Sequence, residues 1–264
     1  MVADDDRPVA IATRRERVRA ATVEEIKATA RRLLVDQGPE SVTLRAIARE
    51  MGMTAPALYR YFGSHDELLR AVIADVYDEL ADAIEAARDA YPEERPAERL
   101  FAMAREFRRW SVAHRPEFGL VFAAPIPSAV DVPSPLDKAG SRFGAAFIGG
   151  FYQLFERRPF PVSADEDLPP ALRAQLAAYR DRLCESIGEQ VMALPLGSFD
   201  TFLASWVQLY GFVALEVFDH LTFALADAEP AFEANLRRVA AALGVEGQLR
   251  EAGSTVRDAH SAVD

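Results

Sequence analysis

The side chains best suited to chemistry gather near the N-terminus of this 264-residue chain. Tyr59, Arg60 and Tyr61 are consecutive, and Arg45 precedes Tyr59 by fourteen residues. Phenol hydroxyls and guanidinium groups are costly to bury without hydrogen-bond partners, so we expect them at a polar surface. A guanidinium fork matches a phosphate or the O6 and N7 atoms of guanine. These residue types indicate noncovalent recognition of an anionic partner, and DNA fits this chemistry.

Sequence signatures of covalent catalysis are missing. The chain has no phosphate-binding glycine loop, no Gly-x-Ser-x-Gly, no His-Glu-x-x-His and no paired-carboxylate pattern. Its four histidines are scattered, and the single Cys184 excludes an internal disulfide and fits a reducing cytoplasm. We therefore expect a protein that is not an enzyme and that uses no cofactor and no metal.

The charge is distributed unevenly along the chain. The formal net charge is −11, which at first argues against a nucleic-acid partner. Residues 7–70, however, hold twelve Arg and Lys against eight Asp and Glu, whereas residues 71–264 hold eighteen against thirty. Because salt screens each patch over about 10 Å, a weakly basic N-terminal segment can hold DNA despite an acidic remainder.

Nothing in the sequence predicts a membrane partner. The first residues, MVADDD, lack the apolar stretch of a signal peptide. No run approaches the roughly 18 uninterrupted apolar residues that a membrane-spanning helix needs. We therefore expect a cytoplasmic protein with no membrane contact.

Apolar residues recur at helical spacing, which predicts an all-α protein. Thr22 and Glu25 form a capping box that predicts the start of a first helix ending at Gly38-Pro39. Thr43 is expected to cap a short helix to about Met51, and Thr54 another through Phe62. Ser64 starts a fourth helix that runs to about residue 90. Further helices are predicted at about 97–114, 116–123, 136–157, 170–193, 199–226 and 230–243, with loops at 125–135 and 159–170.

The two short helices at residues 43–62 have the features of a helix-turn-helix. Ala48 is small where the helices would cross, and Gly52 suits a turn at positive φ. The wedge between the helices is expected to be filled by Ile47, Met51, Met53 and Leu58. A helical hairpin inside an ordinary bundle is the alternative, but the cluster of tyrosines and arginines favours a DNA-facing helix.

Residues 22–70 closely resemble the DNA-binding domain of the TetR/AcrR (tetracycline-repressor) family. The matching motifs are Ser41-Val42-Thr43-Leu44-Arg45-Ala46-Ile47-Ala48, Met51-Gly52-Met53, Leu58-Tyr59-Arg60-Tyr61-Phe62-Gly63-Ser64 and Asp66-Glu67-Leu68-Leu69. The resemblance implies an N-terminal three-helix DNA-binding domain, a fourth helix that links it to a larger ligand-binding domain, and dimerisation through the last two helices.

The resemblance also implies which residues contact DNA. Those that would approach bases are Arg45, Ala55, Pro56, Ala57 and Tyr59. Those that would hold phosphates are Thr43, Thr54, Tyr59, Tyr61 and His65. The family usually carries Lys where this chain has His65. The role of the basic stretch Arg14, Arg15, Arg17 and Arg19 stays open between a solvated tail and a contact to the DNA backbone or minor groove.

A second, weaker resemblance lies near the C-terminus. Residues 206–216 are similar to the Trp-x-x-x-His-Gly (WHG) signature of one TetR subgroup, with Tyr210 in place of the His. Gly211 costs a helix interior about 1 kcal/mol relative to Ala, which suggests the close approach of another helix. The final helix carries an apolar stripe of Phe232, Leu236, Val239 and Leu243. Two such helices would pair with their copies in a homodimer, or else form ordinary monomer core.

Aromatic residues accumulate in the C-terminal part, and some of them would line a pocket for a small, largely apolar effector. The candidate ligand-binding residues are Trp110, His114, Phe118, Phe147, Phe151, Gln153, Trp206 and Tyr210.

We expect a flexible basic arm at 1–21, a helix-turn-helix domain at 22–68, a ligand-binding and dimerisation domain at 69–245 and a flexible tail at 246–264. The predicted function is a transcriptional regulator, a repressor, that binds a palindromic double-stranded operator as a homodimer and is released by the effector. The alternative is a helical adaptor or ligand-binding protein that has lost DNA binding.

Overall fold

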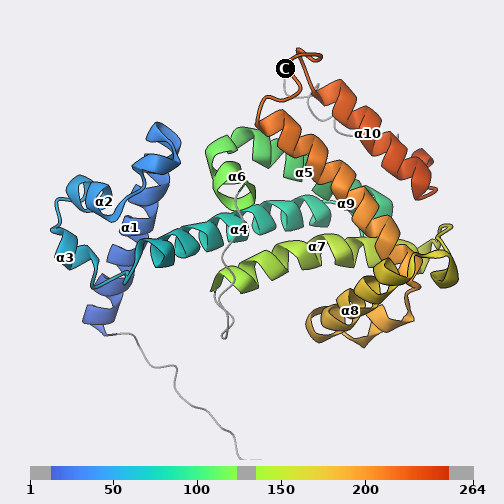
Figure 1. The fold of residues 1–264 in the computed structure, drawn as a ribbon, viewed down its shortest axis with the longest axis horizontal. Helices are drawn as coiled ribbons and strands as arrows, with labels where there is room; N and C mark the ends of the chain where they lie inside the picture. The colour runs from blue at the N-terminus through green and yellow to red at the C-terminus, as the bar shows by residue number, and fades with distance from the viewer. Residues whose placement is uncertain (1–12, 124–134, 250–264) are drawn as a thin grey trace, which may run out of the picture. The chain divides into compact units, whose positions relative to one another are not determined.

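The computed structural model of the chain describes residues 13–123 and 135–249 (Figure 1). Every regular element in these residues is helical, which confirms the all-α prediction. The chain forms two compact units that divide between Ile73 and Ala74. We call the first unit the head and the second the body.

In the head, residues 13–73 contain three complete helices and one short 3-10 turn. Their bounds are α1 (Arg14–Gln37), η1 (Pro39–Ser41), α2 (Leu44–Glu50) and α3 (Ala55–Leu58). Helix α4 (His65–Asp89) begins in the head and ends in the body, close to the predicted end at residue 90. It starts as predicted at Ser64, whose hydroxyl accepts a hydrogen bond from the Glu67 amide over 3.0 Å.

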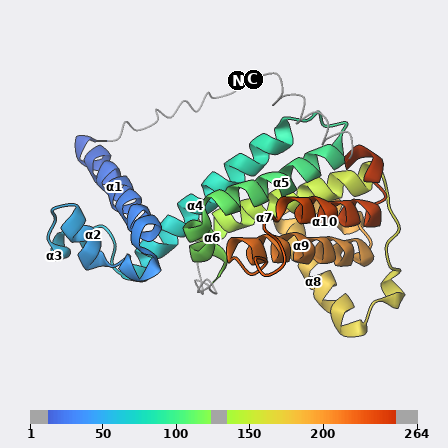
Figure 2. The same ribbon diagram turned by 90° about the horizontal axis from the view of Figure 1, so that it is seen from above.

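The described residues of the body include six further helices and two 3-10 turns. Figure 2 shows their arrangement from above. Their bounds are α5 (Pro96–Ala113), α6 (Arg115–Phe122), α7 (Pro135–Arg157), η2 (Asp165–Asp167), α8 (Pro170–Ile187), η3 (Glu189–Ala193), α9 (Leu196–Val217) and α10 (Glu229–Ala242). In both views α5, α7, α9 and α10 run side by side, and α5 packs against both α7 and α9. None of the helices in the described ranges is both long and apolar enough to cross a membrane.

The first helix begins earlier than the sequence analysis predicted. Thr13 caps α1, and its hydroxyl and the Glu16 carboxylate make the two reciprocal hydrogen bonds of a capping box. Thr22 lies inside the helix, where its hydroxyl donates to the Val18 carbonyl. The predicted start at Thr22 is therefore wrong, because the same Thr-x-x-Glu pattern occurs twice. Of the expected flexible arm, residues 1–12 lie outside the described residues, and the arginines from Arg14 onward are helical.

Aromatic side chains fill the centre of the body. Phe107 of α5 is fully buried, and its ring lies 5.7 Å from both Phe143 and Trp206. The rings of Phe118 and Phe147 lie 6.3 and 6.2 Å from it. Such tilted and edge-on pairs suit the charge distribution of aromatic rings, so most of the predicted aromatic set forms core.

Two body helices end earlier than predicted, each at a residue with positive φ. Gly188, at φ 116°, ends α8, so residues 170–193 form an α-helix followed by η3 rather than one helix. Asp219, at φ 58°, follows the end of α9, whereas the predicted helix continued to residue 226. Arg115 holds this corner, since its guanidinium bonds the Val217 carbonyl at 3.0 Å and the Asp219 carboxylate at 2.7 Å. A tertiary contact of this kind overrides apolar spacing.

The segment that leads into α8 is anchored at the start of α9. A Cβ atom on Gly197 would lie 2.1 Å from the Ser163 carbonyl oxygen, so this position accepts only glycine. The Asp165 carboxylate also accepts a hydrogen bond from the Leu196 amide over 2.9 Å. A small hydrophobic cluster, which includes Leu176 and Phe199, lies within this region.

Parts of the predicted chain organisation lie outside the described residues. They are the loop at 125–135, apart from its last residue, and the tail from residue 250 onward. The first residues of that predicted tail, 246–249, are helical, and the adjoining Val245 and Leu249 are buried.

Candidate nucleic-acid interface and cavities of the body

The turn between α2 and α3 has the geometry that the sequence predicted. Gly52 adopts φ 64°. Its amide donates to the Arg49 carbonyl over 3.2 Å, and the Met53 amide donates to the Ala48 carbonyl over 2.8 Å. These two bonds form a Schellman motif, which ends a helix with glycine in the left-handed region. The chain therefore reverses within four residues, and α2 and α3 form a helix-turn-helix.

The wedge between the two helices is filled largely as expected. Ile47 and Leu58 are fully buried, and Ala48 is 2% exposed where α3 crosses α2. Met51 and Met53 are half-buried. Because apolar side chains hold the pair together from inside, the polar residues of both helices are left on the outside.

Helix α3 is shorter than predicted. It ends at Leu58, and residues 59–61 form hydrogen-bonded turns, with the Tyr61 amide bonded to the Leu58 carbonyl over 2.9 Å. Thr54 occupies the capping position, but its hydroxyl makes no capping bond, which corrects the predicted cap. The Thr54 hydroxyl is thus available to an external partner.

Two predicted DNA-contacting side chains of the turn region reach the surface. Tyr59 is 54% exposed. Tyr61 is half-buried, and the Arg19 guanidinium lies 5.1 Å from its ring centroid, a cation–π distance. Arg19 also donates to the Arg60 carbonyl over 3.2 Å. The first helix therefore contacts the segment that follows α3.

The remaining predicted contacts lie at the starts of helices. Arg45 is exposed in the first turn of α2 and pairs with no carboxylate among the described residues. Thr43 is exposed and caps α2, because its hydroxyl accepts the Ala46 amide over 3.1 Å. That hydroxyl retains a hydrogen to donate. In α3, Ala55 and Ala57 are half-buried and Pro56 is exposed.

His65 makes contacts within the head. Its Nε2 atom lies 2.5 Å from the Val42 carbonyl, and its Nδ1 atom lies 3.9 Å from the Asp66 carboxylate. Because a carbonyl oxygen can only accept, Nε2 carries a proton and donates it to Val42. Nδ1 is therefore the ring nitrogen that is left to interact with an external group.

Arginines surround a shallow hollow of about 610 Å³ on the head. It is lined by Arg14, Arg15, Val18 and Arg19 of α1 and by Arg60 and Tyr61 after α3. None of these four arginines pairs with a carboxylate in the described part of the chain. Their charge is therefore not neutralised within the head.

The body treats its arginines differently. Arg108 of α5 forms two hydrogen bonds of 2.7 Å with the carboxylate of Glu216 in α9, and both side chains are largely buried. Burial lowers the pKa of Arg108, but the bonds to Glu216 and its charge outweigh burial, so the pKa rises above its ordinary value. Arg105 bonds Glu233 of α10 at 2.7 and 2.9 Å in the same way.

Two of the predicted ligand-binding residues, Trp110 and His114, pack together away from the cavities described below. The Trp110 indole donates to Glu79 over 3.2 Å, and its ring stacks on His114 with centroids 4.4 Å apart. Phe118 is fully buried in the aromatic core. A fourth, Gln153, is exposed on α7. Tyr210 donates to the Phe122 carbonyl over 3.0 Å, and burial raises its pKa. None of the five lines a described cavity.

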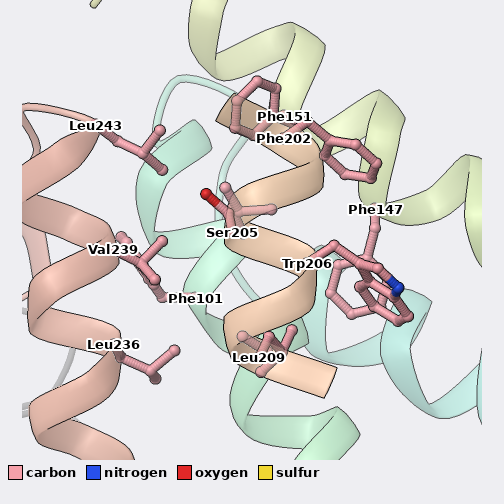
Figure 3. A pocket seen from close by; sticks show the side chains of 12 residues that line it. Phe101, Phe147, Phe151, Phe202, Ser205, Trp206, Leu209, Leu236, Val239 and Leu243 are labelled. Atoms are coloured by element: carbon pink, nitrogen blue, oxygen red, sulfur yellow. The ribbon is translucent and has the colours of Figure 1, made fainter. Parts of the chain in front are cut away.

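A small apolar cavity of about 40 Å³ lies between α9 and α10 (Figure 3). Leu236, Val239 and Leu243 of α10 point toward α9, and Phe151 of α7 closes another side. The space admits a few water molecules at most, so it is a packing defect rather than an effector site.

A larger cavity of about 470 Å³ lies among α7, α8 and α9. The predicted residues Phe147 and Trp206 line both cavities. Figure 3 shows their side chains on the side of α9 that faces away from α10. A cavity of this volume is within the range of small-molecule sites.

Family comparisons agree with this architecture. Residues 20–72 match the model of bacterial regulatory proteins of the tetR family, and residues 100–239 match the tetracyclin repressor-like C-terminal domain. The chain belongs to the TetR family. This confirms the resemblance drawn from residues 22–70, and it makes the chain a DNA-binding transcriptional regulator and not an enzyme.

Relatives of this TetR-family chain are regulators too. HTH-type transcriptional regulator Mb1846 of Mycobacterium bovis is 29% identical over 87% of this chain and 93% of its own length. PksA of Bacillus subtilis, also an HTH-type regulator, is 35% identical over 27% of this chain and 36% of its own length. The crystal structure of the regulatory protein SCO4313 is 27% identical, with a TM-score of 0.63 over 86% of this chain and 98% of that one.

The sequence analysis missed the α8 wall of the larger cavity. Leu172, Leu176 and Tyr179 line it at helical spacing, with Gln175 and Arg182 on the same face. This i, i+3, i+4, i+7 pattern is visible in the sequence. The predicted pocket, however, was built mainly from aromatic residues, and α8 has one tyrosine and no other aromatic residue.

Proposed function

We propose that this chain is a repressor that binds a palindromic operator as a homodimer and is released by a small, largely apolar effector bound in the body. The observation that carries the proposal is the exposed outer side of the helix-turn-helix, where Arg45 and Tyr59 lie free to meet a duplex. A DNA-binding regulator acts where the chromosome is, so we place it in the cytoplasm.

In this proposal Arg45 reads a base, since a fork donor bonded to guanine contributes about 1–3 kcal/mol of discrimination. Ala55, Pro56 and Ala57 give close apolar contact at the start of α3, for instance to a thymine methyl. Thr43, Thr54, Tyr59, Tyr61 and His65 hold phosphates and fix the register. Thr54 and Tyr59 have hydroxyls without a partner among the described residues, which suits them to this role.

A second copy of the chain would cover an apolar stripe on α9. Leu203, Val207, Leu215 and Phe218 are 44, 60, 43 and 38% exposed at helical spacing. Gly211 lies in the same stripe, and a Cβ atom there would meet nothing within 4 Å. Since no described group approaches Gly211, its cost to the helix is offset if a partner helix packs closely there.

The stripe predicted on α10 does not serve this interface. Phe232, Leu236, Val239 and Leu243 are at most 8% exposed, because they face α9 and α5 within the protomer. The proposed interface therefore uses the outer face of α9.

Sedimentation velocity tests the dimer. We expect the unaltered chain to sediment as a dimer and Val207→Glu to sediment as a monomer, because two carboxylates would be buried across the two-fold axis. The matched control Val35→Glu alters an exposed valine of α1 and should remain dimeric. A monomeric unaltered chain would refute the dimer.

A gel-shift titration tests operator binding, with the promoter next to the chain's own gene as the probe. We expect Arg45→Ala to weaken binding about tenfold to a hundredfold, in line with the loss of about 1–3 kcal/mol. Two half-sites about 34–36 Å apart should be protected together. Absence of sequence-preferring binding would favour the alternative of a helical adaptor that has lost DNA binding.

A further inference from the structure

We propose that the cavity among α7, α8 and α9 binds an apolar carboxylate, with the Arg182 guanidinium as the anion-binding group. The inference rests on the proposed function, because it specifies the chemical class of the effector. It adds the charge of the ligand and a residue that recognises this charge.

The floor and sides of the cavity are apolar. Phe143 and Phe147 of α7 and Phe199 of α9 line it and are at most 6% exposed. Leu176 of α8 is similarly buried. Trp206 adds an indole, whose ring lies 5.4 Å from that of Phe147. Such walls favour a hydrocarbon or aromatic tail over a polar one, at about 25 cal/mol per Å² buried.

The polar groups of the cavity are mainly hydrogen-bond donors. Arg182 carries a full positive charge, and Gln175, the Tyr179 hydroxyl and the Trp206 indole N–H can all donate. No Asp or Glu lines the cavity in the part of the chain that the structure describes. A donor-rich, carboxylate-free set matches a ligand with acceptor oxygens and disfavours an ammonium.

Arg182 has no carboxylate partner among the described residues, unlike Arg105 and Arg108 of the body. Its guanidinium lies 5.9 Å from the ring centroid of Tyr179, another lining residue. The hydroxyl of Tyr179 makes no hydrogen bond to a described residue, and burial raises its pKa, so it remains a neutral donor at pH 7. Two donors from consecutive turns of α8 are thus available to one anionic head group.

Arg182 has no carboxylate partner among the described residues, although the body is acidic overall. Residues 71–264 carry eighteen Arg and Lys against thirty Asp and Glu. Arg182 is exposed, so it lies at the edge of the cavity, where it can meet the charged head group of a ligand whose tail lies among the apolar walls. A bound carboxylate would supply the missing partner, and a guanidinium fork fits it in a bidentate manner.

The test uses the fluorescence of Trp206, which lines the cavity. The chain has two tryptophans, so Trp110→Phe leaves Trp206 as the single reporter. Octanoate, 1-octanol and octylammonium are titrated as probes of equal tail length that differ in charge. We expect octanoate to change the Trp206 emission saturably and to bind at least about tenfold more tightly than octanol.

Variants assign the effect to this cavity. Arg182→Gln should weaken octanoate binding about tenfold and leave octanol binding unchanged. Arg180→Gln removes the same charge from the same helix at a residue outside the lining and should leave both unchanged. A Cβ atom on Gly144 would meet nothing within 4 Å, so Gly144→Phe should fold, fill the cavity and abolish binding of both probes. Thermal melting checks that each variant folds.

The outcomes separate this inference from the proposed function. Tight octanoate binding that depends on Arg182 supports the carboxylate site. If octanoate binds in this way but leaves operator affinity unchanged, only the effector-release proposal is refuted. Equal affinities for the three probes, no saturable response to octanoate, or equal effects of the Arg182 and Arg180 variants would overturn the carboxylate site.

Discussion

Several arginines of the head lie exposed beside the helix-turn-helix with no carboxylate partner among the described residues, whereas several arginines of the body bridge its helices. Arg14, Arg15 and Arg45 illustrate the first kind. Arg108 and Arg105 illustrate the second, each held at about 2.7 Å by a carboxylate of another helix. Arg105 and Arg108 thus stabilise the fold of the body, whereas Arg14, Arg15 and Arg45 of the head are left for an external anion.

This contrast explains why net charge misleads here. The sum of −11 counts head and body together, but charges that are paired within the body hardly attract DNA. What matters for DNA is the local set of unpaired cations. The following changes test the contrast, from the largest expected effect to the smallest.

Glu216→Gln should lower the free energy of unfolding by about 2 kcal/mol, because it leaves the largely buried Arg108 without its charged partner. Urea denaturation gives the value. Glu229→Gln is the control, since Glu229 also approaches Arg108, at 3.6 Å, but is 69% exposed and should change stability by less than about 0.5 kcal/mol. Equal effects would mean that burial does not distinguish these pairs.

The double variant Arg14→Ala/Arg15→Ala should weaken operator binding about tenfold near 0.1 M salt and reduce the slope of log affinity against log salt by about 2. The cause is the loss of two unpaired cations that line the hollow on the head. Gel shifts at several salt concentrations measure both quantities. Arg157→Ala/Arg158→Ala removes the same charge from the end of α7 in the body and should leave the slope unchanged.

His65→Lys should tighten operator binding about threefold at pH 7, because a fixed ammonium at the start of α4 adds attraction to a phosphate. The loss of the 2.5 Å contact between His65 and the Val42 carbonyl offsets part of the gain. Gel shifts at low salt and at 0.5 M salt compare the two proteins, and the gain should vanish at high salt. Unchanged or weaker binding at low salt would count against a phosphate contact here.

Arg45→Ala should change the free energy of unfolding by less than about 0.5 kcal/mol, since Arg45 is exposed and unpaired among the described residues. Urea denaturation checks this beside the Glu216 variant. A destabilisation as large as that of Glu216→Gln would show that Arg45 has a structural role and would blur the contrast between head and body.

The helix-turn-helix could be predicted in detail because its determinants are local. Gly52 fixes the turn through backbone geometry, and Thr43 caps the helix that immediately follows it. The start of α1 was misplaced because Thr13 and Thr22 both satisfy the capping pattern, and only the folded chain chooses between them. Local signals identify candidates, and the choice among them requires tertiary context.

The cavity could not be predicted with similar success because it depends on which helices become neighbours. Phe147 and Trp206 were found by their type, whereas Trp110 and His114 have the same character but pack beside Glu79 of α4. The sequence alone did not indicate a role for Arg182, because that role depends on which residues surround it in the fold. No Asp or Glu is among the described residues that line its cavity. Such an absence becomes visible only once all neighbours are placed.

The close contact between Gly197 and the Ser163 backbone brings the two ends of residues 163–197 together, so this segment forms a closed loop. Helix α8 carries the residues proposed to recognise the effector, and it lies between the two segments that meet at this contact. The hydrogen bond from the Leu196 amide to Asp165 strengthens the contact. Since closing a loop costs little more as it lengthens, this span can absorb insertions or a new lining without unravelling the rest of the body. The ligand preference can therefore change in evolution through substitutions within this loop, provided that Gly197 is retained.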